Sequence, residues 1–320
     1  MSDTPIVIDI QNLSHRYKTH LALNGVTFTV AARSIHGFVG PNGAGKTTTL
    51  KVLATLLRPQ TGSVSLFGHD IVRERKEVRR KIGFMPDHFS MYRQMSVFEY
   101  LDFFGAAYGL LQSQRDKTIA DVLALTDMAG RRNDLISGLS RGMQQRVSLA
   151  RVLVHDPDVL LLDEPASGLD PRARIELMEI LEELRRLGKT IFISSHILSE
   201  LATLCDHVTI MDRGMVKYTG SMRGLVTQSE GSTAHYQITL ATEHPAAIGA
   251  LAKLPGILSI TPPLPSEPRY TLAFERTQVA LNSILQTAIA AGAEVVAFSE
   301  ETRHLNQAFM DLTEPGVRPE

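Results

Sequence analysis

The sequence predicts an α/β fold built on a parallel β-sheet, followed by a smaller α+β domain. A glycine-rich loop at residues 40–48 stands between a short apolar run and a segment that favours a helix. Two later apolar runs, residues 159–162 and 190–194, each end in polar side chains. Continuous apolar runs are typical of strands buried on both faces of a parallel sheet. After residue 228 the composition changes and the element pattern becomes β-α-β-β-α-β.

The glycine-rich loop fits the pattern Gly-x-x-x-x-Gly-Lys-Ser/Thr of a phosphate-binding loop. Its residues are Gly40, Pro41, Asn42, Gly43, Ala44, Gly45, Lys46, Thr47 and Thr48. It follows an expected strand at 35–39 and precedes an expected helix at 49–57, which is the context the motif needs. Glycines let backbone N–H groups approach phosphate oxygens, and a helix N-terminus adds attraction for an anion. We expect Lys46 to reach the β- and γ-phosphates and the Thr47 hydroxyl to ligate Mg²⁺.

Polar side chains come after the two buried-type strands. Asp163 and Glu164 come directly after the run 159–162, and His196 comes shortly after the run 190–194. Ligands of parallel sheets gather beyond the carboxyl ends of the strands, so these groups are expected near the phosphate-binding loop. Asp163 is suited to hold Mg²⁺, and Glu164 to polarise a water that attacks the γ-phosphate.

The rest of the first 227 residues is expected to form strands at 7–17, 21–30 and 63–67 and a helical insertion at about 88–156. Ser96 and Glu99 fit a capping box that opens a helix, and the aromatic residues after it are expected mainly in a core. Tyr17, at a strand end, is either a surface aromatic or a ring stacked on a base. A helix at 171–187 begins with proline, and residues 197–204 are also expected to be helical.

Composition excludes several classes of function. The chain has 320 residues, 43% hydrophobic residues and a net charge of −1, so no nucleic-acid-binding surface is expected. Cys205 is the only cysteine, which suits a reducing compartment. No signal peptide is recognisable, and no run of about 18 apolar residues occurs. Any role at a membrane is therefore expected to depend on a partner.

The carboxy-terminal part is expected to be a separate domain. Residues 228–234 are polar and suit a linker between a domain at 1–227 and one at 235–320. The order β-α-β-β-α-β predicts a ferredoxin-like sandwich, with a helix at 303–312 and a tail after it. No catalytic constellation is recognisable there, so interaction or regulation is expected of it.

A third motif carries a family resemblance. Residues 139–146 read Leu-Ser-Arg-Gly-Met-Gln-Gln-Arg, just before an expected helix. With the phosphate-binding loop before it and Asp163 after it, this segment resembles the signature loop of an ATP-binding-cassette (ABC) ATPase. Ser140 and Gly142 match the usual Leu-Ser-Gly-Gly-Gln form, whereas Arg141 and Met143 stand in place of the first glycine and the glutamine. The resemblance implies a P-loop hydrolase fold with a RecA-like parallel sheet, an antiparallel β subdomain and a helical subdomain.

The resemblance also implies roles for single residues. Tyr17 is similar to the adenine-stacking aromatic, which favours ATP over GTP. Asp163 and Glu164 are similar to the Mg²⁺ aspartate and the catalytic glutamate, and His196 to the histidine that senses the γ-phosphate. The segment 167–170, ending at Asp170, resembles the loop that crosses the dimer interface. Cofactors are expected to be ATP and Mg²⁺.

One residue departs from the family pattern at the metal site. Asp87 stands where the family usually has a glutamine that touches Mg²⁺ and the membrane partner. A carboxylate oxygen can still meet the metal or its water shell, but the side chain is shorter and adds negative charge. Asp87 is therefore expected to contribute to the nucleotide and metal site with a geometry different from that of glutamine.

In this family, two cassettes close over two ATP molecules, and each signature loop completes the partner's site. Ser140 and the amides near Gly142 are suited to a γ-phosphate; Arg141 is either an added charge there or a solvated surface residue. The implied partners are a second cassette, most simply in a homodimer, and a multispanning membrane permease. The expected place is the cytoplasmic face of the membrane. The carboxy-terminal domain resembles the extension of some export-type ATPases, which favours export over uptake.

Three other classes of protein remain as alternatives. A soluble cassette ATPase acting on ribosomes or DNA usually carries two cassettes, and only one phosphate-binding loop is present. A nucleotide-gated module without turnover would not need Glu164. A small-molecule P-loop kinase would have no role for the signature loop or His196.

Overall fold

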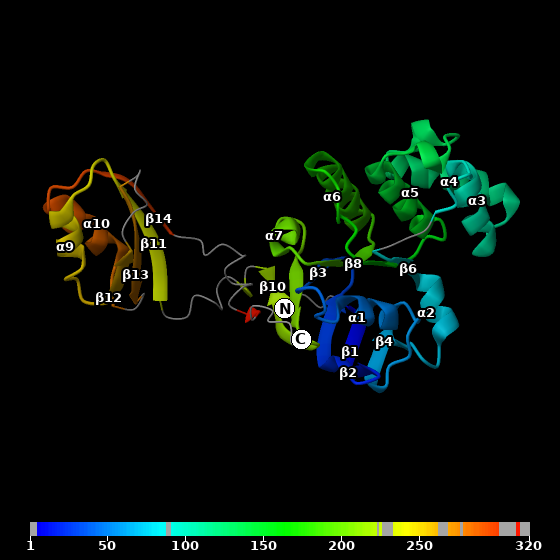
Figure 1. Ribbon diagram of the computed structural model, residues 1–320, viewed down its shortest axis with the longest axis horizontal. Coiled ribbons are helices and arrows are strands. Elements are labelled where there is room, and N and C mark those ends of the chain that lie inside the picture. Colours follow the sequence, from blue (N-terminus) through cyan, green and yellow to red (C-terminus); the bar gives the residue numbers. More distant parts are fainter. Residues whose placement is uncertain are drawn as a thin grey trace. The chain divides into compact units, whose positions relative to one another are not determined.

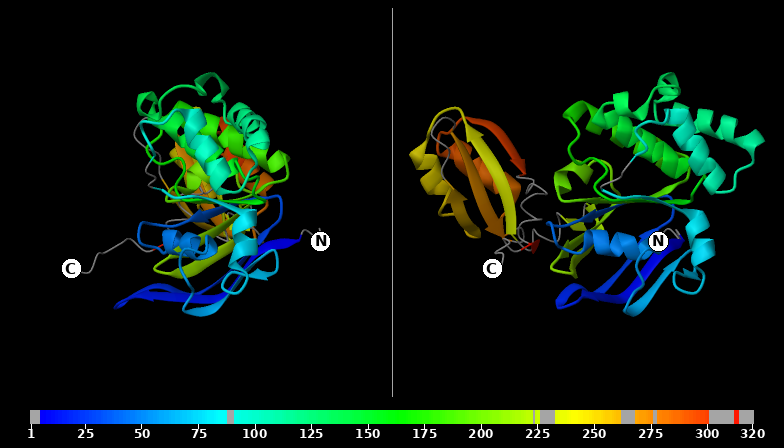
Figure 2. Two further views of the ribbon diagram at one scale, coloured as in Figure 1. Left: turned by 90° about the vertical axis from the view of Figure 1, so that its right-hand side faces the viewer. Right: turned by 45° about the vertical axis from the view of Figure 1, so that its right-hand side comes forward.

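The computed structural model describes residues 5–87, 91–222, 224–225, 233–261, 268–275, 278–300 and 312–313. The chain divides into two compact units (Figures 1 and 2). The first comprises Met1–Met222 with Leu312–Glu320, and the second comprises Arg223–Asp311.

A six-stranded sheet forms the centre of the first unit. Its order is β10-β9-β3-β8-β7-β6, with β6, β7, β8, β3 and β9 parallel and β10 antiparallel at the edge. The strands are β3 (Ile35–Val39), β6 (Ile82–Met85), β7 (Val159–Leu162), β8 (Thr190–Ser195), β9 (His207–Asp212) and β10 (Met215–Ser221). Every residue of β3, β7 and β8 is buried. This confirms that the continuous apolar runs form the centre of a parallel sheet.

A second, antiparallel sheet lies on one side of the central sheet (Figure 1). Its order is β2-β1-β4-β5, and its strands are β1 (Ile6–Tyr17), β2 (His20–Ala31), β4 (Thr61–Leu66) and β5 (His69–Asp70). Phe28 of this sheet stacks on Phe192 of the central sheet with ring centroids 5.7 Å apart. Side chains of both sheets and of helix α1 (Lys46–Leu53) form one core.

Most helices lie on the other side of the central sheet (Figures 1 and 2). They are α3 (Val97–Ala107), α4 (Gln112–Leu125), α5 (Arg141–Leu153) and α6 (Pro171–Arg186), with the short 3-10 turns η1 (Ala129–Arg131) and η2 (Ile136–Gly138). The predicted capping box is present: Ser96 Oγ accepts from the Glu99 N–H, and Glu99 accepts from the Ser96 N–H. Helix α2 (Arg75–Lys81) precedes β6.

Two helices differ from the sequence prediction. Helix α1 begins at Lys46 and ends at Leu53, where residues 49–57 were expected, because Thr55 adopts φ 59° and the Leu56 N–H turns back to the Lys51 carbonyl. Helix α7 (Leu198–Leu201) has one turn, where residues 197–204 were expected. After it, the Leu204 and Cys205 N–H groups both bond the Leu201 carbonyl, and β9 begins at His207.

The second unit has the expected order β-α-β-β-α-β. Its elements are β11 (Thr233–Leu240), α9 (Pro245–Leu251), β12 (Ile257–Thr261), β13 (Arg269–Glu275), α10 (Leu281–Ala290) and β14 (Val295–Glu300). The sheet is antiparallel in the order β12-β13-β11-β14, and both helices contribute to its core. Residues 233–234, expected in the linker, belong to β11. Residues 228–232 of that linker, and the helix expected at 303–312 except for Leu312, lie outside the described residues.

Candidate active site

The glycine-rich loop leaves the carboxyl end of β3 and leads directly into α1. A side chain at Gly40 would place its Cβ 2.3 Å from the Met211 carbonyl oxygen, so β9 leaves no space for one. Gly45 caps α1 at φ 105°, and a Cβ there would lie 2.7 Å from the Ala22 carbonyl oxygen of β2. Close packing against two strands therefore requires both glycines and holds the loop in place.

The remaining residues of the loop have distinct surroundings. Asn42 and Gly43 are exposed at its tip. Ala44 is buried; its N–H bonds the Pro41 carbonyl, and its own carbonyl accepts from the Gly214 N–H. Thr47 and Thr48 lie in the first turn of α1.

Lys46 lies inside the loop with 6% of its surface exposed. Its Nζ donates to the Gly40 carbonyl at 2.6 Å and to the Pro41 carbonyl at 3.3 Å, and lies 3.3 Å from Glu164 Oε1. A buried ammonium group surrounded by the backbone of the loop fits the charge of a nucleotide's phosphates.

Asp163 comes directly after β7 and is 1% exposed. Burial raises the pKa of its carboxyl group, opposed by hydrogen bonds from the Ser194 and Thr47 hydroxyls, while the charges of Asp87 and Glu164 raise it further. Thr47, Asp87 and Asp163 are therefore close enough to share an electrostatic environment. One hydroxyl and two carboxylates are the hard oxygen ligands that suit Mg²⁺, whose coordination shell is usually completed by phosphates and water. Within the described ranges, no cluster of three or more His, Cys, Asp or Glu side chains suits a metal.

Glu164 connects the loop to His196. Its Oε2 lies 2.8 Å from His196 Nδ1, while Oε1 faces Lys46. Its backbone adopts φ 49°, and its N–H donates to Ser194 Oγ at 2.9 Å. The same Ser194 hydroxyl donates to Asp163 at 2.7 Å, so one serine orients both carboxylate residues. Sequence reasoning missed this role, although a hydroxyl in the last polar positions of a buried strand is a usable signal.

Tyr17 is exposed and lies at the turn that joins β1 to β2. It pairs with His20, and its ring packs edge-on against His15 with centroids 4.8 Å apart. Farther along β2, Ala22 contacts Gly45 of the loop. The turn that carries Tyr17 is thus connected to the loop through β2.

The signature-like segment forms the start of α5. Ser140 caps the helix by accepting from the Met143 N–H at 3.3 Å. Arg141 is exposed, as expected of a surface residue, and its Nη2 donates to the Ser167 carbonyl of its own chain at 3.0 Å. Asp170 caps α6 by accepting from the Ala173 N–H at 2.9 Å.

Gly142 lies with Ser140 and Asp170 near the start of α5. A Cβ at Gly142 would lie 3.1 Å from the Ala173 Cβ, so α5 and α6 approach closely there. A cavity of about 450 Å³ is lined by Ser140, Gly142 and Asp170 among others. The candidate residues thus form two groups, one around Lys46 and Glu164 and one around Ser140 and Asp170.

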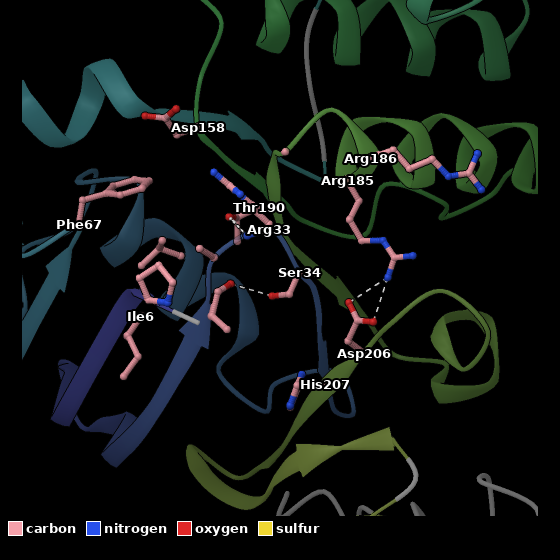
Figure 3. Close-up of a pocket in the computed structure, with 15 residues that line it drawn as sticks. Ile6, Arg33, Ser34, Phe67, Asp158, Arg185, Arg186, Thr190, Asp206 and His207 are labelled. Atoms are coloured by element: carbon pink, nitrogen blue, oxygen red, sulfur yellow. Dashed lines mark hydrogen bonds and ion pairs between the residues drawn. The ribbon is translucent and has the colours of Figure 1, made fainter. Parts of the chain in front are cut away.

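A larger cavity, of about 1260 Å³, lies at the other edge of the central sheet (Figure 3). Ser34, Thr190 and His207, which line it, precede or begin β3, β8 and β9. Arg185 crosses one wall and bonds Asp206 at 2.9 Å. This cavity is therefore at the amino ends of the strands, whereas the predicted site residues lie at their carboxyl ends.

Comparisons with known proteins agree with this geometry. Residues 23–167 match the sequence profile of the ABC transporter family. The Nod factor export ATP-binding protein I of Burkholderia lata is 37% identical over 70% of this chain and 74% of that protein. The daunorubicin resistance ATP-binding protein DrrA3 of Streptomyces coeruleorubidus is 31% identical over 98% of this chain and 97% of that protein.

A solved structure shares the fold of the first unit. CbiO1 of Clostridium perfringens, described as part of the ABC transporter complex cbiONQ, superposes with a TM-score of 0.64 at 28% identity. The match covers 70% of this chain and 92% of that one. Across the part of the chain that the structure describes, no helix is both long and apolar enough to cross a bilayer. The similarity to the family profile and to both relatives, together with the loop, Glu164 and the signature-like helix, establishes that the chain is an ATPase of the ABC transporter ATP-binding protein family.

Proposed function

We propose that the chain uses Mg²⁺·ATP to drive export through a separate membrane-spanning permease, as one of two cassettes in a dimer. The observation that carries the proposal is the position of Glu164, which faces Lys46 with one oxygen and His196 with the other. That arrangement puts a carboxylate between the phosphate-binding loop and an imidazole, which suits a group that polarises a water for attack on a γ-phosphate.

Each residue of the first group has a proposed task. The loop amides and Lys46 neutralise the phosphates, and Thr47, Asp163 and Asp87 hold the metal directly or through water. Mg²⁺, when bound, supplies neutralisation of charge that builds on the phosphate oxygens. Glu164 orients the attacking water and accepts a hydrogen bond from it, and His196 keeps Glu164 in place. Tyr17 supplies a ring face for adenine.

The second cassette is proposed because the donors of the signature segment lie apart from the phosphate-binding loop. Ser140 and the N-terminal amides of α5 are suited to a γ-phosphate, but they gather with Asp170 around a different cavity. Two chains related head to tail would bring the signature group of each against the loop of the other, with neither site complete alone.

A membrane partner is supported by exposed aromatic residues near α3. These aromatics were expected mainly in a core, and Tyr100 is buried, but Phe103 and Tyr108 are exposed. Tyr92 is also exposed, and its ring lies 5.8 Å from that of Phe103. Exposed aromatic pairs are typical of protein interfaces. Export, rather than uptake, is supported by the names of the two relatives, one for Nod factor export and one for daunorubicin resistance.

Two measurements test the proposal. First, the tagged chain is purified from detergent-solubilised membranes, and a co-purifying multispanning protein is expected. Recovery with ribosomes or DNA instead would favour the soluble cassette class. Second, Glu164→Gln is expected to retain ATP binding while losing turnover. Full turnover in this variant would reject the role of Glu164, and failure of both the variant and the unmodified chain to bind ATP would reject the nucleotide site.

A further inference from the structure

Two side chains of α5 reach the short segment after Glu164. Arg141 Nη2 donates to the Ser167 carbonyl at 3.0 Å, and the buried Gln145 amide donates to the Pro165 carbonyl. The helix that carries the signature-like segment is therefore bonded at two points to the turn that begins at Glu164.

That turn is tight and holds the backbone of Glu164. The Ser167 N–H bonds the Glu164 carbonyl at 3.0 Å, and Glu164 itself adopts φ 49°. Gly168 comes next at φ 67°. The Ser167 carbonyl therefore belongs to the same hydrogen-bonded turn as the backbone of Glu164.

The Arg141 guanidinium also lies directly against Gly168. A Cβ at Gly168 would fall 2.5 Å from Arg141 Cζ, a distance that real side chains do not adopt. The bare backbone of Gly168 thus makes room for the planar guanidinium, whose N–H groups suit a fixed carbonyl partner. A lysine at 141 would offer a single ammonium on a flexible stem in place of this plane.

We infer that Arg141 is a positioning residue that acts within its own chain, tying the start of α5 to the turn after Glu164. This inference rests on the proposed function, in which the start of α5 contacts the γ-phosphate bound by the partner cassette. When the start of α5 contacts the γ-phosphate bound by the partner, Arg141 shifts and displaces the Ser167 carbonyl of its own chain. The turn then shifts the Glu164 carboxylate of that chain, which serves the other nucleotide site of the dimer. Each glutamate is thereby made responsive to nucleotide in the opposite site.

The competing role for Arg141 is direct contact with the partner's nucleotide, and mixed dimers separate the two. Each site of a dimer takes Glu164 from one chain and the signature segment from the other. Dimers with Glu164→Gln in one chain only, assembled with the permease, keep one working site. Arg141→Met is then placed either on the chain that keeps Glu164 or on the chain that carries Glu164→Gln.

If Arg141 acts within its own chain, ATPase activity is lost only in the first arrangement, in which Arg141→Met is on the chain that keeps Glu164. There, kcat is expected to fall about tenfold while KM for ATP changes less than about twofold. In the second arrangement, both constants are expected to stay within about twofold of the dimer that carries Glu164→Gln alone. A larger loss in the second arrangement, or equal loss in both, overturns the inference. Arg80→Met is the matched control, because Arg80 lies in α2, outside both groups of candidate residues, and its side chain is 74% exposed.

A second measurement needs no turnover. In the full-length chain, Arg141→Met is expected to speed amide hydrogen exchange at Ser167 and Leu169 by about fivefold or more, with α5 and α6 unchanged. Arg80→Met is expected to leave these amides protected, and Arg141→Lys to restore part of the protection. Unchanged exchange in Arg141→Met overturns the inference. If the reference dimer fails to hydrolyse ATP, that result counts against the proposed function, and the exchange result still decides the role of Arg141.

Discussion

Glu164 Oε2 and His196 Nδ1 are 2.8 Å apart, although 32 residues separate them in the sequence. Glu164 comes after β7 and His196 after β8, and these neighbouring parallel strands end at the same edge of the sheet. The His196 side chain is 43% exposed, whereas the Glu164 side chain is only 13% exposed. A surface histidine is thus bonded to a mostly buried carboxylate next to the phosphate-binding loop.

This pairing leads to a test of His196. We expect His196→Ala to lower kcat for ATP hydrolysis by about tenfold to a hundredfold, because Glu164 loses the partner that fixes one of its oxygens. Binding of ATP is expected to change little, since Lys46 and the loop remain. Steady-state ATPase assays and nucleotide binding measure the two effects. His69→Ala, which removes a β5 histidine paired with Glu74, is a control; a similar loss in both variants would contradict a specific role for His196.

A second test concerns the carboxylate that stands where the family usually has glutamine. Asp87 lies close enough to Asp163 for its charge to raise the pKa of that group. Removing the charge in Asp87→Asn is expected to weaken the attraction for a cation, so the Mg²⁺ concentration for half-maximal ATPase activity should rise by about threefold to tenfold. The measurement is a Mg²⁺ titration at fixed ATP.

The control for this titration is Asp121→Asn, which removes an exposed charge from α4. It is expected to leave the Mg²⁺ dependence unchanged. An Asp87→Asn protein whose titration overlays that of the unmodified chain would remove Asp87 from the metal site.

The sequence alone predicts the central sheet because its signals are local. The runs at 159–162 and 190–194 are short and rich in apolar residues, as expected of strands buried on both faces, and the loop at 40–48 marks the edge where the sheet presents its ligand. Contacts between distant segments are not visible in one sequence. The bond from Arg141 to Ser167 and the double role of Ser194 depend on which strand ends and helix ends meet.

A buried histidine makes the stability of the first unit sensitive to acid. Burial lowers the pKa of His36 from 6.5 to about 3, and the nearby His207 acts in the same direction. The unfolded chain therefore binds a proton below pH 6.5 that the folded chain refuses until about pH 3. Stability from this group is complete above pH 6.5 and is lost as the pH falls toward 3, with a loss of about 2 kcal/mol by about pH 5.

Replacing His36 removes this loss. In His36→Phe, the new ring is expected to pack with Phe28 and Phe192. The Thr209 hydroxyl, which bonds His36 Nε2, loses that partner but keeps its bond to the Thr219 hydroxyl. Urea denaturation at about pH 7.5 and about pH 5 should show a smaller drop in the free energy of unfolding for this variant than for the unmodified chain, by about 2 kcal/mol. His20→Phe, at an exposed turn, is expected to keep the full drop. An equal drop in all three proteins would show that His36 titrates normally.

The contact between Arg141 and Gly168 gives a final prediction. Gly168→Ala places a methyl group where the Arg141 guanidinium lies and adds strain at φ 67°, so the bond from Arg141 to Ser167 is expected to break. The variant should lower kcat about as much as Arg141→Met does. Because both changes break the same link, the double variant should lose little more than either single one. Gly188→Ala, also at positive φ but with no neighbour near its Cβ, measures the cost of the backbone conformation alone. If the losses in Gly168→Ala and Arg141→Met multiply in the double variant, the two residues act independently and the link through Ser167 is wrong.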